Sequence, residues 1–399
     1  MAIRDDVGRY VDDLVAIRRD LHAHPELAFE ERRTARLVAD TLRAYGVDEV
    51  HTGIAGTGVV GVVRGGGPGG SGRSNRAIGL RADMDALPIT ERNDFAHRSG
   101  TDGRMHACGH DGHTTMLLGA ARYLADKRDF DGTVYLIFQP GEERGGGGRR
   151  MIEAGLFERF DCQSVYGMHN LPGVEVGRIA MRAGPCMASS DAFRIRVTGQ
   201  GGHGAWPHLA RDPVVVGAHI VTALQAIVSR LVDPLEPAVL SVAKFETGTA
   251  FNVIPDEATL IGTARSFDPD TRTLIEGEAR RIAAQVATAF DARAEVAFMR
   301  GYPATINSDE ETRVAARAAG LAVGDSNLSS DWPAQMGAED FAYMLEKRPG
   351  CYIWLGNGVD GEAGGNSLHS PSYDFNDSAI PHGVAYWAAL VETVLPKAA

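Results

Sequence analysis

Residues 134–143 have the sequence Val-Tyr-Leu-Ile-Phe-Gln-Pro-Gly-Glu-Glu, in which an apolar run is followed by a Pro-Gly turn and two carboxylates. A continuous apolar run of this length is typical of a strand that is buried on both faces, as in a parallel sheet. Ligands gather at the carboxyl ends of such strands. We therefore interpret Glu142 and Glu143 as candidate site residues at the rim of a parallel sheet, although a Glu-Glu pair alone is usually solvated surface.

The neighbouring segments repeat an alternation of strand, loop and helix. Residues 77–82 and 164–168 have the composition of two further buried strands, and His169 follows the second of them. Apolar residues at helical spacing occupy 116–124 between these strands. This order predicts an α/β fold with a mostly parallel sheet and helices on both faces.

The order of the expected strands and helices changes after Gly184. The expected elements then follow the order strand, helix, strand, strand, helix, strand: 191–198, 213–230, 238–245, 258–267, 271–290 and 294–299. That order is typical of a ferredoxin-like α+β unit. We therefore predict a catalytic domain in two parts, 1–186 and 301–399, and an inserted domain, 187–300.

The densest group of potential metal ligands is the segment Met105–His113, which contains three imidazoles, a thiol and a carboxylate. Thiolate and imidazole suit Zn²⁺ and the neighbouring first-row ions. We interpret this segment as a loop that supplies two ligands to a hydrolytic metal centre and expect the other ligands later in the chain. The alternative is a His-rich turn before a helix, with Cys108 as a small buried hydrophobe.

Composition limits the other possibilities. The chain has 399 residues, of which 44% are hydrophobic, and a formal net charge of −12, so we expect two or more domains and no nucleic-acid partner. We identify no apolar stretch that approaches the roughly 18–20 residues of a membrane span, and no signal-peptide pattern at the start. Four scattered cysteines without a CxxC pair are typical of free thiols. We therefore predict a cytoplasmic protein without a membrane partner.

Two further segments resemble functional motifs, but we assign neither of them to a phosphate or metal site. The Gly-rich stretch 65–74 lacks the Gly-Lys-Ser/Thr ending of a phosphate loop, so we interpret it as a hairpin tip. The pair His22 and His24 follows a predicted helix and not a barrel strand. We interpret this pair as the edge of a substrate pocket or as surface histidines, and not as metal ligands.

The segment Gly103–Thr114 resembles the signature of the metal-dependent aminoacylase and carboxypeptidase-like amidohydrolases, a family that includes hippurate hydrolases and indole-acetyl-amino-acid hydrolases. The resemblance extends in order along nearly the whole chain, through Ile137–Glu143, Gly167–Gly173, Met187–Ser190, Gly202–His208, Phe251–Pro255, Gly262–Ser266 and Gly337–Phe341. The chain departs from the pattern at Gly141, where alanine is expected, and at Arg144, directly after the glutamate pair.

The resemblance implies a centre with one or two divalent ions, for which Mn²⁺, Zn²⁺, Co²⁺ and Ni²⁺ are all suitable. The implied ligands are Cys108, His110, Glu143, His169 and His369. Glu142 is then the general base and acid. His106 and His113 lie outside the ligand set of the family.

The resemblance also implies that the inserted domain is a lid and dimerisation module, so we expect a homodimer or a dimer-based oligomer. His203 is then expected to reach a neighbouring active site and to stabilise the tetrahedral oxyanion. Asn252 and Arg265 are expected to hold the free carboxylate of the substrate. Considered without the resemblance, a strand-borne arginine and a Gly-Gly-His turn are ordinary surface features.

We expect this chain to hydrolyse the amide bond of a small N-acyl amino acid of the hippurate kind to a carboxylic acid and a free amino acid. A bound divalent ion lowers the pKa of its water from 15.7 toward ~7, and Glu142 then accepts the proton. One alternative is a dipeptidase or carboxypeptidase with the same centre. Two others are a cysteine hydrolase with Cys108 as the nucleophile and a non-catalytic small-molecule binder.

Overall fold

The parallel sheet expected around residues 134–143 organises the first of two compact units. The computed structural model describes residues 2–66 and 74–397, so most of the predicted Gly-rich hairpin tip, 67–73, lies outside the described residues. Unit 1 contains the described residues up to Gly184, Ile306–Pro333 and the residues from Asp340 on. Unit 2 contains Pro185–Thr305 and Ala334–Glu339. The domain boundaries expected from the sequence, 1–186, 187–300 and 301–399, stay a prediction.

Within the described residues, unit 1 contains an eight-stranded sheet. Its order is β1 (Glu49–Ile54), β2 (Gly58–Arg64), β4 (Thr133–Gln139), β3 (Ala77–Asp83), β5 (Ser164–Pro172), β16 (Gly350–Gly358), β6 (Ile179–Ala180) and β15 (Leu328–Ser329). The central strands β4, β3, β5 and β16 are parallel to one another, whereas β1, β2 and β4 pair in antiparallel fashion. The predicted mostly parallel sheet is confirmed.

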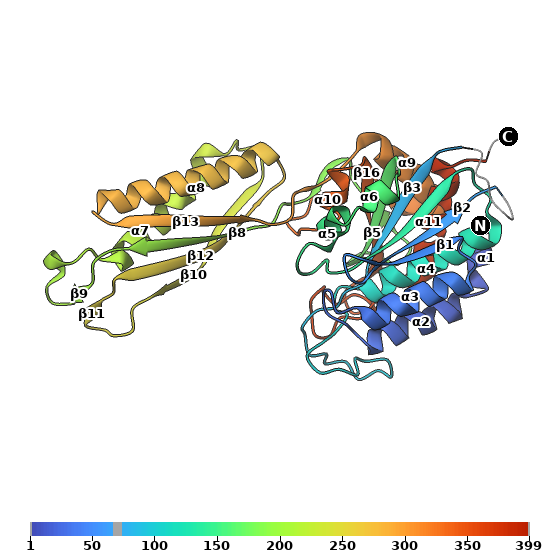
Figure 1. Ribbon diagram of the computed structural model, residues 1–399, viewed down its shortest axis with the longest axis horizontal. Coiled ribbons are helices and arrows are strands. Elements are labelled where there is room, and N and C mark those ends of the chain that lie inside the picture. Colours follow the sequence, from blue (N-terminus) through green and yellow to red (C-terminus); the bar gives the residue numbers. More distant parts are fainter. Residues whose placement is uncertain (1, 67–73, 398–399) are drawn as a thin grey trace. The chain divides into compact units, whose positions relative to one another are not determined.

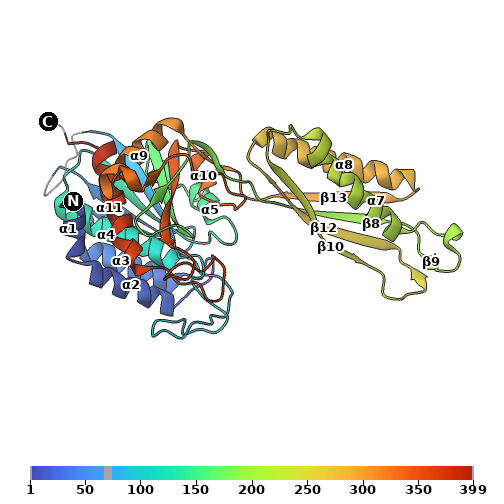
Figure 2. The same ribbon diagram turned by 180° about the vertical axis from the view of Figure 1, so that it is seen from behind.

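Helices cover both faces of this sheet, as Figures 1 and 2 show. The helices on one face are α1 (Ala2–Gly8), α2 (Val11–Ala23), α3 (Arg32–Ala44), α4 (His110–Lys127), α9 (Asp309–Val323) and α11 (Ile380–Val394). The shorter helices on the other face are α5 (Gly147–Glu153), α6 (Leu156–Arg159) and α10 (Ala342–Leu345). Because β3, β4 and β5 are enclosed on both sides, they have continuous apolar runs and not the alternating pattern of a half-exposed strand.

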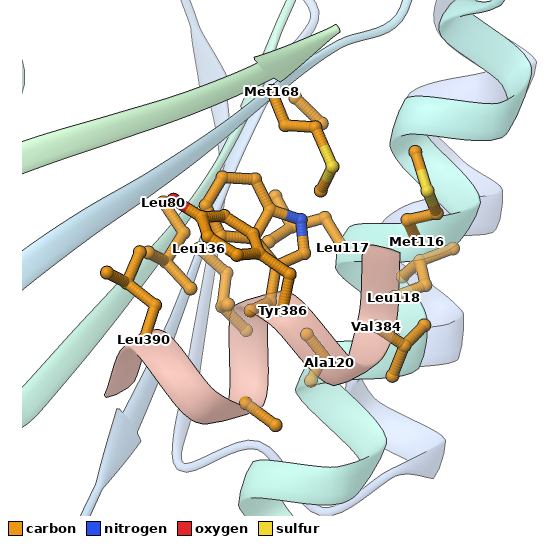
Figure 3. Close-up of a cluster of buried hydrophobic side chains, with 14 of the residues drawn as sticks. Leu80, Met116, Leu117, Leu118, Ala120, Leu136, Met168, Val384, Tyr386 and Leu390 are labelled. Atoms are coloured by element: carbon orange, nitrogen blue, oxygen red, sulfur yellow. The ribbon is translucent and has the colours of Figure 1, made fainter. Parts of the chain in front are cut away.

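The main core lies between α4, α11 and the central strands. Figure 3 shows side chains of these two helices, such as Leu117 and Tyr386, facing Leu80 of β3, Leu136 of β4 and Met168 of β5. All of these side chains are buried. This packing fixes the position of α4, whose N-terminus begins at His110.

Unit 2 has the β-α-β-β-α-β order expected from the sequence. Its main elements are β8 (Asp191–Thr198), α7 (Pro213–Ala226), β10 (Ala238–Thr247), β12 (Glu257–Ser266), α8 (Pro269–Ala289) and β13 (Arg293–Arg300). The strands form an antiparallel sheet in the order β10, β12, β8, β13. Alternate residues of β8, including Phe193, Ile195 and Val197, are buried in a core that α7 and α8 share. Both helices begin with an aspartate cap followed by proline.

The remaining elements are short. The strands β9 (Gly202–His203) and β11 (Val253–Ile254) pair with each other in unit 2. The others are β7 (Gly184–Met187), β14 (Thr305–Asn307), the 3₁₀ turns η1 (Pro207–Leu209), η3 (Asp325–Asn327) and η4 (Asp377–Ala379), and the π-helical turn η2 (Ile227–Leu231).

The prediction that no apolar stretch approaches the length of a membrane span is wrong. α7 and η2 form one continuous helical segment, Pro213–Leu231, of 19 residues, within which an 18-residue window has a mean hydropathy of 1.7. His219 and Gln225 interrupt the apolar run in the sequence without interrupting the helix. By length and composition this segment could span a bilayer, but one side of it packs in the core of unit 2.

Candidate metal centre

The rim of the parallel sheet collects the predicted ligands of unit 1. Glu142 and Glu143 follow β4, His169 lies on β5, and His110 begins α4. Gly109 precedes this helix with φ of +90°, a left-handed conformation that favours glycine. A side chain at Gly109 would collide with Asn170 and Tyr373, so the tight turn between Cys108 and His110 requires glycine.

The five predicted ligands form two groups that share one atom. The ligand atoms of Cys108, His110 and His169 lie within 4.8 Å of one another, and so do those of Cys108, Glu143 and His369. Cys108 Sγ lies 3.4 Å from His169 Nε2, and Glu143 Oε1 lies 3.2 Å from His369 Nε2. Thiolate, imidazole and carboxylate are donors that suit first-row divalent ions, and the Cys108 sulfur is within reach of both groups.

The hydrogen bonds around the two buried histidines prepare them for metal binding. His110 donates from Nδ1 to the carbonyl of Asp85 (2.8 Å), and His169 donates from Nδ1 to the carbonyl of Asn170 (2.7 Å). Because Nδ1 of each ring is held by a backbone carbonyl, Nε2 is the nitrogen that is left for a cation. Among the described residues, the buried Nε2 of His110 has no hydrogen-bond partner, a costly arrangement that a cation would relieve. The donors thus fit a divalent metal.

The electrostatics also favour a cation. Burial and the neighbouring carboxylates of Glu143 and Glu142 raise the pKa of the Cys108 thiol well above its ordinary value. Although burial disfavours a charged ring, Asp83 and Asp85 raise the pKa of His110 to about 10. A thiol in this negative potential is a poor nucleophile by itself but becomes a thiolate ligand beside a cation. These surroundings count against the cysteine-hydrolase alternative.

Asp85 holds the backbone of the glutamate pair, a role that was not predicted from the sequence. Its two carboxylate oxygens accept the backbone N–H groups of Glu142 and Glu143, both at 3.0 Å. This double hydrogen bond fixes the turn that aims the glutamate pair. The position of an aspartate at the end of a predicted buried strand was the available signal, but its partners lie 57 and 58 residues away in the chain.

The two histidines outside the predicted ligand set differ in their contacts. His113 donates from Nδ1 to Asp83 (2.6 Å) and accepts the backbone N–H of Asn170 at Nε2 (3.0 Å), so both of its ring nitrogens are occupied. His106 is buried, and this burial lowers its pKa to about 4. Neither histidine belongs to the two groups that share Cys108.

Contacts on both sides hold the loop that carries His369. The backbone N–H of His369 donates to the carbonyl of Ala107 (2.8 Å), and the residue has φ of +62°. Further along this loop, the hydroxyl of Tyr373 donates to Asn170 (2.7 Å). The buried Arg18 of α2 pairs with Asp374 at 2.8 Å. Helix α2 therefore anchors the loop that contributes His369.

The interpretation of His22 as a surface or pocket-edge histidine is wrong. Its ring is fully buried and contacts Asp111 through Nδ1 (2.8 Å) and Glu91 through Nε2 (3.2 Å). Although burial disfavours the charged ring, these two carboxylates raise the pKa of His22 to about 9. His22 thus joins α2 to α4 in a buried ionic network, whereas His24 is exposed.

The predicted residues of unit 2 fall at two separate places. His203 lies on β9 opposite Val253, and the carbonyl of Asn252 accepts the N–H of Gly204 (2.8 Å), so His203 and Asn252 share one exposed tip. Arg265 lies near the other end of β12, about 25 Å along the strand from Glu257. The structure therefore does not bring Arg265 together with the other two residues within one copy of unit 2.

Residues 79–393 match the sequence profile of the peptidase family M20/M25/M40. The chain belongs to this family. It is 42% identical to a hippurate hydrolase of Campylobacter jejuni over 374 residues, which cover 94% of each chain. It is also 39% identical over 393 residues to a thermostable carboxypeptidase of Saccharolobus solfataricus, with 97% of each chain covered.

A solved M20-family structure agrees with this membership. The YXEP protein of Bacillus subtilis, described as a dinuclear metal-binding peptidase, superimposes with a TM-score of 0.84 at 33% identity, over 97% of this chain and 99% of that one. The predicted resemblance and the predicted fold class are confirmed. The chain is an M20-family hydrolase with a divalent-metal site.

Proposed function

We propose that this M20-family hydrolase cleaves the amide bond of N-acyl amino acids and releases a carboxylic acid and a free amino acid. The observation that carries the proposal is the position of Glu142: one of its carboxylate oxygens, one of the Glu143 carboxylate oxygens and a ring nitrogen of His110 all lie within 4.8 Å of one another. The similarity to a hippurate hydrolase supports the same substrate class.

The proposed centre holds one or two divalent ions, with Mn²⁺, Zn²⁺, Co²⁺ and Ni²⁺ as candidates. The proposed ligands are Cys108, which both groups share, together with His110, His169, Glu143 and His369. A divalent ion bound there lowers the pKa of water and polarises the substrate carbonyl.

Glu142 moves the proton in the proposed mechanism. Its carboxylate accepts a proton from the attacking water, whose oxygen adds to the carbonyl carbon, and later donates this proton to the leaving nitrogen as the C–N bond breaks. Asp85 fixes the backbone of Glu142, and the backbone N–H of Asp340 donates to Glu142 Oε1 (3.4 Å). Both contacts limit the movement of the base between its two roles.

We further propose a cytoplasmic homodimer in which unit 2 supplies residues to the active site. Two features of unit 2 support a second copy as the partner: β10 lies at the edge of its sheet, and α7 exposes Val214 and Val215. Because His203 and Asn252 lie far from Arg265 within one copy, we propose that a partner's His203 and Asn252 complete each site. In this arrangement Arg265 and Asn252 hold the substrate carboxylate.

A substrate panel with metal reconstitution tests the proposed reaction. We expect the metal-stripped enzyme to be inactive and to recover with one or more of the four ions. The recovered enzyme should hydrolyse N-benzoylglycine at least about tenfold more efficiently (kcat/KM) than Gly-Phe, since a free ammonium is costly to desolvate next to bound cations. Faster hydrolysis of the dipeptide would instead support the dipeptidase or carboxypeptidase alternative, with which the similarity to a hippurate hydrolase agrees less well.

Complementation between two inactive variants tests the shared site. We expect His203→Ala and Glu142→Ala to be inactive separately. After unfolding and refolding together, about a quarter of the wild-type activity should return, because half of the dimers are mixed and each has one intact site of two. Mixing two samples of Glu142→Ala is the control. Absence of recovery in a mixture that sedimentation shows to be dimeric would place His203 in the site of its own chain.

A further inference from the structure

A cavity of about 310 Å³ adjoins the candidate metal centre in unit 1. Glu143 lies in its wall, so the cavity begins where the scissile carbonyl is proposed to bind. Its other lining residues include Leu27, Phe29, Pro88, Arg144 and Arg150. The cavity is large enough for an aromatic or extended acyl group.

Phe29 forms an aromatic wall of the cavity and packs beside Gly141, where this chain departs from the family pattern. The backbone of Phe29 has φ of +63°, a left-handed conformation that is uncommon for residues other than glycine and asparagine. A Cβ atom at Gly141 would lie 2.6 Å from the ring of Phe29, so the alanine expected at position 141 would displace this ring. Gly141 therefore makes room for Phe29 beside the glutamate pair.

The second departure, Arg144, introduces a positive charge at the same cavity. Arg144 is exposed, and among the described residues no carboxylate forms an ion pair with it. The guanidinium of Arg150 stacks on the Phe29 ring at 4.1 Å. The carboxylate of Glu30, which also lines the cavity, pairs with Arg104 at 2.9 Å. The wall thus contains two arginines and two glutamates, and both glutamates have other partners: Glu30 pairs with Arg104, and Glu143 lies in the candidate metal centre. Arg144 is the cation of the wall that is left for a ligand.

We infer that this cavity binds the acyl group of the substrate and that Arg144 selects acyl groups that carry a carboxylate of their own, such as carboxybenzoyl. The inference rests on the proposed function, in which the amino-acid carboxylate binds to residues of unit 2 and the acyl group extends from the metal centre into unit 1. An aromatic acyl group packs between Leu27, Phe29 and Pro88, and its distal carboxylate reaches the planar donor fork of Arg144.

The test compares N-benzoylglycine with N-(4-carboxybenzoyl)glycine, which differ only in the distal carboxylate. We expect wild-type kcat/KM to be about tenfold higher for the carboxylated substrate, in keeping with one charge-assisted hydrogen bond near the surface. Arg144→Gln should abolish this preference and leave hydrolysis of N-benzoylglycine within about threefold of wild type. Product inhibition provides an independent readout: terephthalate should inhibit more strongly than benzoate in wild type only.

Arg149→Gln is the matched control. Arg149 is an exposed arginine close to Arg144 in the chain, but it contacts Glu153 at 3.5 Å and does not line the cavity. We expect this variant to retain the full preference. Ala28→Trp should fill the cavity and slow both aromatic substrates while sparing N-acetylglycine.

Failure of the inference and failure of the proposed function give different results. Hydrolysis of both aromatic substrates without a preference, or a preference that survives Arg144→Gln, removes Arg144 from substrate selection and leaves the proposed function intact. Failure of the metal-loaded wild type on every N-acyl amino acid overturns the proposed function, and the inference with it.

Discussion

Replacing Glu142 with alanine is expected to lower kcat on N-benzoylglycine by about 10²–10⁴-fold, the range attributed to a positioned general acid–base group. The loss follows from the two proton transfers proposed for this carboxylate. Because Glu142 is not among the proposed ligands, the variant should keep the metal content of wild type. Steady-state kinetics and elemental analysis of the same preparation measure both quantities.

Glu142→Gln sharpens this experiment. Glutamine keeps the size of the side chain and its hydrogen bond from the N–H of Asp340, but it does not accept the proton of water. We therefore expect the glutamine and alanine variants to be similarly inactive. Glu153→Ala, at an exposed glutamate that contacts Arg149, is the control for loss of a carboxylate. Near-normal turnover with bound metal in either Glu142 variant would remove this residue from the mechanism.

Replacing Cys108 with alanine is expected to remove most of the bound metal and to lower activity by several orders of magnitude. Cys108 is the one side chain common to the two ligand groups of the structure, so its loss weakens both. His369→Ala removes a donor from one group only and should retain more metal. Elemental analysis of both variants after identical dialysis measures the difference.

Chelation of the wild-type enzyme tests whether Cys108 acts as a metal ligand or as a nucleophile. Treatment of wild type with EDTA should abolish activity, and added ions should restore it, whereas a cysteine hydrolase would survive chelation. Cys162→Ala is the matched control, since this thiol is also buried and free but lies outside both groups. Wild-type metal content in Cys108→Ala would contradict the proposed shared ligand.

Local sequence patterns predicted the strands and helices, but not always the burial and the partners of their side chains. The apolar runs of β4 and β5 were recognisable because burial on both faces removes polar residues from a strand. The helix over 213–230 was predicted, but its apolar character was missed because scattered polar side chains such as His219 and Gln225 divide the apolar run into short pieces. The burial of His22 was missed because its carboxylate partners, Asp111 and Glu91, are 89 and 69 residues away.

The sequence by itself determined the order of strands and helices, the α/β class and the family, since these depend on periodicity and on motifs within short segments. Only the tertiary structure decided that Cys108 is common to two ligand groups, that Asp85 holds the glutamate pair, and that Phe29 packs against Gly141. Each of these contacts joins residues far apart in the chain. Their distances depend on how helices and strands pack together, which short-range periodicity does not encode.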